Sequence, residues 1–247
     1  RKSQAEIEKM ARAGLVVREC LGMLGREVGP GITTGELDRL AEEFIRSKGG
    51  VPTFKGYRGF PGSICASPND TVVHGIPGRV RLHEGDILGI DVGVTLEGYI
   101  ADAAVTFPVG EISQEARELL RVTEESLWRG IAQCQVGNRV GDISHAVQEH
   151  AEAHGFSVVE SMVGHGVGQE MHEDPQVPNF GSAGQGPELR EGMVLAIEPM
   201  VNIGDHEVVM GEDSWAIYTR DGSLSAHFEH TVAITRNGPR PLTAAEV

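Results

Sequence analysis

Cysteine is scarce in this sequence, and so are the features that would place the chain in a membrane. Its 247 residues include only three cysteines, Cys20, Cys65 and Cys134, which lie far apart and form no CxxC pair. Three scattered thiols do not make a disulfide framework, which favours a reducing compartment. No apolar run reaches the ~18 residues that a transmembrane helix needs, so no membrane span is expected.

Positive charge is also in short supply. The chain has 36 acidic residues against 21 Lys and Arg, a formal net charge of −15, and this argues against a nucleic-acid partner, which needs a basic face. The N-terminal stretch RKSQAEIEKMARAG lacks the apolar core of a signal peptide. We therefore expect a cytoplasmic protein without a membrane partner. Because the sequence begins with Arg1 rather than Met, we expect a few native residues to precede it.

The hydrophobic content, 40%, is enough for a sizeable core. Amphipathic patterns predict helices over residues 3–28, 113–134 and 140–155, and another that starts from an N-cap at Thr34 and stops at Gly49. Apolar, β-favouring runs lie between and after these helix pairs. The order of helix pair, strands, helix pair and strands predicts one domain over residues 1–247, built from two similar halves.

Residues 86–110, DILGIDVGVTLEGYIADAAVTFPVG, are the clearest hairpin candidate. If the turn is centred between Leu96 and Glu97, Asp91 pairs with Asp102 on one face, with Cβ atoms about 4.5–5.5 Å apart. A bulge at Gly98 would shift this pairing. Carboxylates inside apolar strands are costly unless a cation neutralises them. The hairpin therefore suggests a divalent metal site, the alternative being two strand-edge aspartates that face water.

Further candidate ligands have similar surroundings. Glu198 in VLAIEPM and Glu229 in SAHFEHTVAI lie in apolar or aromatic strand contexts, and glycines surround His165 in GHG. Four carboxylates and one imidazole suit a pair of divalent ions, and this mixed oxygen and nitrogen set admits Co, Mn, Fe or Zn. His150 and His154 in HAEAH do not follow the H-E-x-x-H order of a zinc helix. Solvated helix histidines are the preferred interpretation of that pair.

Five segments occur in one order along the chain: NDTVVHGIP, GIDVGV with GYIADAAVTF, GHGVGQEMHEDP, IEPM and SAHFEHTV. Together they strongly resemble the type I methionine aminopeptidases, and the resemblance covers nearly the whole chain. It implies the pita-bread fold, an α+β fold in which curved antiparallel sheets are related by a pseudo-two-fold axis and helices pack outside. It also implies a metallo-exopeptidase that removes the initiator methionine from newly made proteins when the second residue is small. The expected enzyme is a monomer that works near the ribosome.

The resemblance also implies the roles of individual residues. The metal ligands for two divalent ions would be Asp91, Asp102, His165, Glu198 and Glu229, with Asp102 and Glu229 as the bridging carboxylates. A metal-bridging hydroxide would attack the scissile carbonyl, and Glu198 would accept the proton of the water. His172 would stabilise the oxyanion and His74 would contact the scissile nitrogen.

By position in the motifs, a pocket for the methionine side chain would be lined by Tyr57, Phe60, Cys65, Met171 and Trp215, together with Phe54. Met171 stands directly before His172, where many relatives carry Phe. A flexible thioether fills the same space less rigidly than a ring, so we expect a looser pocket.

Two other functions share these ligands or this fold. Prolidases and proline-specific aminopeptidases use the same five ligands but usually carry a large N-terminal domain, whereas this sequence starts with the catalytic-domain helices. Inactive pita-bread binding proteins have lost ligands, and all five are present here. Type II methionine aminopeptidases carry a helical insertion between the GHG and IEP motifs, and the short stretch from His165 to Glu198 favours type I.

Overall fold

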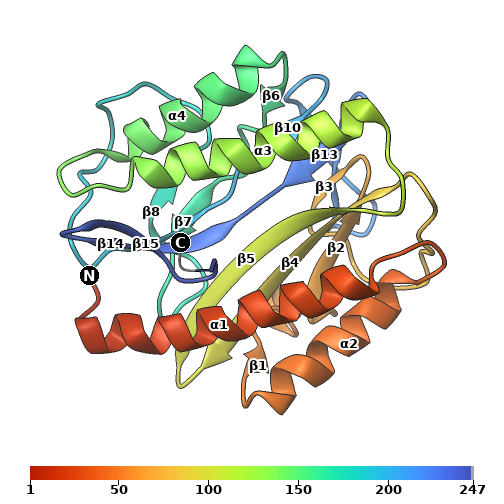
Figure 1. Ribbon diagram of the computed structural model, residues 1–247, viewed down its shortest axis with the longest axis horizontal. Coiled ribbons are helices and arrows are strands. Elements are labelled where there is room, and N and C mark those ends of the chain that lie inside the picture. The colour runs from red at the N-terminus through yellow and green to blue at the C-terminus, as the bar shows by residue number, and fades with distance from the viewer. Residues whose placement is uncertain (246–247) are drawn as a thin grey trace.

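Two pairs of helices enclose the strands of this protein. The computed structural model describes residues 1–245. In Figure 1, helices α1 (Gln4–Glu27) and α2 (Thr34–Ser47) lie along one side, and α3 (Gln114–Ala132) and α4 (Val140–Ala153) lie along the opposite side. The four predicted helices and the α+β class are confirmed. Among the described residues, none of these helices combines the length and apolar character that a membrane span requires.

The predicted start of the second helix was wrong by one residue. Thr33, not Thr34, is the N-cap of α2: its hydroxyl accepts a hydrogen bond from the Glu36 amide, and the Glu36 carboxylate accepts one from the Thr33 amide. This reciprocal capping box satisfies two amides that the first turn leaves without helical partners.

All strand pairings within the described sheets are antiparallel. In one sheet β4 (Ile87–Leu96) lies between β1 (Val51–Pro52) and β2 (Ile64–Pro68) and also pairs with β5 (Tyr99–Pro108). A second sheet has the order β15 (Gly238–Pro241), β14 (His230–Thr235), β9 (Val194–Ile197), β7 (Gly164–Gly166) and β8 (Glu173–Val177). Smaller sheets contain β13 (Ser225–His227), β10 (Met200–Asn202) and β6 (Ser157–Val158), and β11 (Val208–Met210), β12 (Ile217–Thr219) and β3 (Thr71–Val73).

The hairpin of β4 and β5 exists as predicted, but its register differs. Leu96 pairs with Tyr99, so Glu97 and Gly98 form a two-residue turn, and both have positive φ. That conformation suits the twist of a hairpin and is easy for glycine. Asp91 consequently pairs with Ala104, and Asp102 pairs with Gly93. The predicted pairing of Asp91 with Asp102 was wrong, yet a shift of two positions keeps both carboxylates on the same face.

Two large clusters of buried apolar side chains form most of the core. One packs α1 and α2 against β2, β4 and β5, and the other packs α3 and α4 against strands of the C-terminal half. A smaller cluster contains aromatic and sulfur-bearing side chains, among them Phe60, Cys65 and Met171. It lies where the loop after β1 faces the strands that carry the candidate ligands. The division of residues 1–247 into two related halves of one domain stays a prediction.

Candidate metal centre

A single row of residues crosses three elements and carries two of the candidate ligands. Cys65 of β2 pairs with Asp91 of β4, Asp91 pairs with Ala104 of β5, and Ala104 forms an isolated bridge with Glu229. Directly paired residues point to the same face of a sheet. Asp91 and Glu229 therefore flank a methyl group, and the small size of Ala104 leaves space between their carboxylates.

Asp102 lies in β5 two residues before Ala104, so its side chain points to the same face as those of Asp91 and Glu229. Its amide donates to Thr231 Oγ1 at 3.0 Å, and the same hydroxyl lies 3.1 Å from Asp102 Oδ1. Thr231 belongs to β14, just beyond Glu229, so these contacts tie β5 to the strand that carries Glu229. The side chain of Asp102 is almost fully buried.

His165 lies in the middle of β7, between β8 and β9, and glycines flank it for a steric reason. A Cβ atom at Gly164 would collide with the carbonyl oxygen of Ala196, and one at Gly166 would collide with that of Asp174. The His165 Nδ1 lies 2.8 Å from the Gly166 carbonyl oxygen. Because a carbonyl only accepts, Nδ1 carries a proton, and Nε2 is the ring nitrogen that faces the carboxylates.

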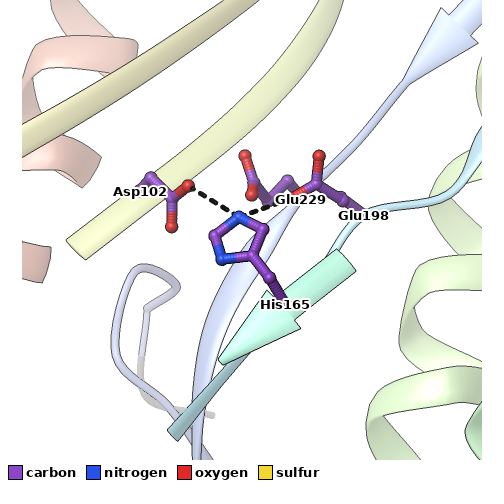
Figure 2. Close-up of side chains that lie close together, drawn as sticks. All are labelled: Asp102, His165, Glu198 and Glu229. Atoms are coloured by element: carbon purple, nitrogen blue, oxygen red, sulfur yellow. Dashed lines mark ion pairs between the residues drawn. The ribbon is translucent and has the colours of Figure 1, made fainter. Parts of the chain in front are cut away.

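Figure 2 shows three carboxylates from separate elements converging on this imidazole. His165 Nε2 lies 3.3 Å from Glu198 Oε2 and 3.7 Å from Asp102 Oδ2. Ligand atoms of Asp102, His165, Glu198 and Glu229 all lie within 4.8 Å of one another. The structure thus brings together the five predicted ligands, since Asp91 lies equally close to Glu229.

Several polar atoms of this cluster are buried without a hydrogen-bond partner. They are Oδ1 of Asp91, Oε2 of Glu198 and both carboxylate oxygens of Glu229. A buried carboxylate oxygen without a partner costs free energy, and several together repel one another. An oxygen-rich site of this kind fits divalent cations, which would satisfy the oxygens and neutralise their charge.

The pKa values of the cluster also indicate a site that fits cations. Burial, with neighbouring carboxylates, raises the pKa of Asp91 to about 8 and that of Glu229 well above its ordinary value. Burial also acts on Glu198, but its interactions with the neighbouring Glu229, His165 and His227 outweigh burial and lower its pKa. Without metal, the carboxylates therefore share protons, and cations would take the place of those protons.

Two more histidines face the same space. His172 follows the glycine-rich segment, and its ring centroid lies 4.4 Å from that of His165. Burial, with the neighbouring His165, lowers the pKa of His172 to about 4. His74 follows β3 with a φ of 63°, a left-handed conformation that is strained for a residue with a side chain and concentrates at functional sites. Burial lowers the pKa of His74 as well.

A cavity of about 440 Å³ connects these histidines to an apolar recess. The predicted wall residues all line it: Phe54, Tyr57, Phe60, Cys65, Met171 and Trp215. The rings of Phe60 and Trp215 meet edge to face at 5.1 Å between centroids. Burial and the nearby Asp91 raise the pKa of the Cys65 thiol, so this wall is uncharged. Because Cys65 pairs with Asp91, the recess begins directly beside the metal ligands.

Sequence reasoning missed one residue of this centre and misjudged another histidine. His227 lies 3.5 Å from Glu198 through Nε2 and Oε1, and its side chain is buried. Its position two residues before Glu229 was a usable signal, because alternate residues of an extended segment share a face. His150 is not a solvated helix histidine: it is buried and contacts Glu125 of α3 at 3.0 Å. His154 is exposed, as predicted.

Comparison with known proteins gives consistent results. The sequence profile of metallopeptidase family M24 matches residues 8–236. The methionine aminopeptidase of Clostridium acetobutylicum is 54% identical over 246 residues, which cover 99% of this chain and 98% of the relative. The crystal structure of methionine aminopeptidase from Thermotoga maritima superposes with a TM-score of 0.97 at 47% identity and covers 99% of this chain and 98% of that one. The pita-bread architecture expected from the sequence is thereby confirmed.

A solved prolidase from Pyrococcus furiosus is a more distant match. It has a TM-score of 0.77 at 22% identity, and the match covers 66% of that chain. At this identity the likeness concerns the fold alone.

Proposed function

The chain belongs to metallopeptidase family M24, and we propose how the residues around its central cavity remove an N-terminal methionine. It is a metal-dependent aminopeptidase that acts on the N-terminal peptides of other proteins and uses two divalent metal ions. The observation that carries the assignment of residues is the convergence of four carboxylates and His165 in a buried cluster with unsatisfied oxygens.

We propose that Asp91, Asp102, His165, Glu198 and Glu229 hold the two ions, with Asp102 and Glu229 shared between them. Divalent ions held there supply Lewis acidity for the scissile carbonyl and the attacking water. Support for a shared Glu229 comes from its position, since its carboxylate lies within 4.8 Å of ligand atoms both in the group with Asp91 and in the group with Asp102.

Three side chains then handle protons and charge. Glu198 accepts the proton of the attacking water, because its lowered pKa keeps the carboxylate ionised and a carboxylate oxygen lies within the cluster. His172 donates a hydrogen bond to the oxyanion that develops on the carbonyl. If the Tyr57 hydroxyl donates to Nδ1 of His172, 3.0 Å away, the ring proton stays on Nε2 and is available to the substrate. His74 contacts the scissile nitrogen and assists its departure.

The recess beside Cys65 takes the methionine side chain. Its walls combine the rings of Tyr57, Phe60 and Trp215 with the thiol of Cys65 and the thioether of Met171. Apolar and sulfur-bearing walls suit a linear thioether, which gains contacts with both rings and sulfur. We further propose that the enzyme prefers peptides whose second residue is small.

The setting of the reaction is also proposed. Newly made N-termini emerge at the ribosome, so we propose that the enzyme acts there, in the cytoplasm, as a monomer and without a nucleic-acid partner. We propose that residues 1–247 form one catalytic domain with two pseudo-symmetric halves. The two helix pairs, each with its own apolar cluster, support this division.

A peptide assay tests the function. Cleavage of a Met-Ala peptide should stop after exhaustive chelation and return when Mn²⁺, Co²⁺ or Fe²⁺ is added. A Gly-Pro dipeptide serves as the control for prolidase activity and should remain intact. Full Met-Ala cleavage by metal-free protein, or Gly-Pro cleavage at a similar rate, would overturn the proposed function.

A further inference from the structure

His227 is a second imidazole inside the acidic cluster, and none of the roles above uses it. Its side chain is 4% exposed, and its Nε2 atom is buried without a hydrogen-bond partner. A ring nitrogen of His227 lies within 4.8 Å of ligand atoms of Asp91 and Glu229. His165 and His227 belong to two different groups of ligand atoms, which share Glu229.

The backbone holds this imidazole in place. The His227 amide donates to Thr106 Oγ1 at 2.9 Å, and the same hydroxyl donates to the His227 carbonyl at 2.9 Å. His227 also pairs with Met200 at the start of β10. These contacts anchor the residue between β5 and β10, and the extended chain from His227 to Glu229 presents both side chains to the cluster.

A purely structural role leaves the ring nitrogen poorly satisfied. The nearest carboxylate atom in contact, Oε1 of Glu198, lies 3.5 Å from Nε2, which is longer than a normal N–H···O hydrogen bond. Ligand atoms on opposite sides of an ion with bonds of about 2.1 Å are about 4.2 Å apart. Ligand atoms of Asp91, His227 and Glu229 lie within 4.8 Å of one another, which leaves room for a cation that would satisfy Nε2 and the unpaired oxygens together.

We propose that His227 is a sixth protein ligand, which gives the ion held by Asp91 and Glu229 its own nitrogen donor. This deepens the proposed function and rests on it, because it requires metal at this centre. Each ion would then have one imidazole, from His165 on one side and from His227 on the other. A nitrogen donor favours Fe, Co or Zn over Mg at the second position, since imidazole suits the later transition metals.

X-ray absorption spectroscopy of the fully loaded Co²⁺ enzyme tests this directly, because the scattering from imidazole rings counts histidine ligands. The wild type should give about one imidazole per ion on average, from one histidine ligand on each ion. His227→Gln should give about half that number. His230→Gln is the control: His230 is half-buried, its Nδ1 contacts Thr243 Oγ1 at 2.8 Å, and its loss should leave the count unchanged.

Metal affinity provides a second readout. His227→Gln should weaken the second ion by 10-fold or more in competition with a chelator, since even the loss of a group that only orients a ligand costs about 10–100-fold. Affinity alone would not separate a ligand from an orienting group, so the imidazole count decides.

The outcomes separate the two proposals. Wild-type protein that binds no divalent metal would overturn the proposed function. Wild-type protein that binds two ions with about half an imidazole per ion would overturn only the role of His227. That second result needs no variant, so the test stands even if His227→Gln fails to fold.

Discussion

The hydroxyl oxygen of Tyr57 lies 3.0 Å from Nδ1 of His172, and their ring centroids are 5.7 Å apart. This contact joins the wall of the apolar recess to the histidine that we propose acts on the scissile carbonyl. Among the described residues, no ion pair joins His172 to a carboxylate of the cluster, so we expect its role to concern the substrate rather than the metal.

His172→Ala should therefore keep both metal ions and lose most of the rate. By the scale for removing one oxyanion donor, kcat should fall by about 10²-fold or more. Elemental analysis and steady-state kinetics on the same preparation check both parts. If the variant loses metal, His172 is a ligand and the assignment is wrong.

Met171 lines the recess, and we expect it to influence selectivity. Its side chain is buried and belongs to the apolar cluster that includes Phe60 and Cys65. A flexible thioether rejects near-isosteres less sharply than a ring, and a methylene-sized difference is worth only about 1–3 kcal/mol in an apolar pocket. We expect measurable cleavage of norleucine peptides, and Met171→Phe should improve the ratio of kcat/KM for Met over norleucine by a modest factor. Unchanged rates and ratio would mean that Met171 does not contact the substrate.

Ala104 leaves the space in which the carboxylates of Asp91 and Glu229 meet. Ala104→Val should weaken metal binding by about 10-fold or more, the scale of disturbing a group that supports a ligand. Ala103→Val is the matched control, because Ala103 is equally buried but packs into the apolar cluster beneath α1 and α2. Both variants should lose about 1–3 kcal/mol of stability through overpacking. Equal metal affinities in the two variants, measured by calorimetric titration, would argue against a role of Ala104 in spacing the carboxylates of Asp91 and Glu229.

Glu42 links α2 to the loop that carries the recess. Hydrogen bonds from Lys55 and Ser63 lower the pKa of Glu42 to about 2 from 4.5. A lowered pKa in the folded state stabilises the protein above the unfolded value, and this contribution is lost as the pH falls from about 4.5 toward 2. Because Glu42 is partly exposed, this contribution to the free energy of unfolding should amount to about 1 kcal/mol.

Glu42→Gln should therefore reduce the loss of stability between pH 5 and 3, the range in which the shifted pKa of Glu42 contributes. Urea unfolding of the metal-free protein at several pH values measures this. Glu43→Gln is the control, since Glu43 lies on the same helix but contacts only Arg39 among the described ion pairs. The same acid dependence in Glu42→Gln and the wild type would contradict the assignment.

The helices and the set of five residues that converge in the cluster could be predicted from the sequence because their signals are local. Amphipathic periodicity and the capping residues of α1 lie within one element, and carboxylates inside apolar strands are conspicuous wherever they occur. The register of β4 and β5 was less accessible, since it depends on whether Glu97 adopts positive φ beside Gly98. Asp91 and Asp102 still share a face because the error was two positions.

The features that the sequence did not reveal depend on contacts between distant segments. The burial of His150 depends on Glu125 in the neighbouring helix, and helix periodicity does not reveal which partner a polar side chain finds. The spacing of His227 and Glu229 places both side chains on one face, but the bridge from Glu229 to Ala104, which brings that face to Asp91, joins segments far apart in the sequence. Such contacts follow from tertiary structure, which pattern reasoning does not supply.

The central claim is that this buried cluster holds two divalent ions with Glu229 shared between them. Calorimetric titration of metal-free protein with Co²⁺ tests it most directly. The wild type should bind two equivalents and Glu229→Gln at most one, with circular dichroism to check that the variant is folded. A wild type that binds no metal, or a folded Glu229→Gln that still binds two ions with unchanged affinity, would contradict the account.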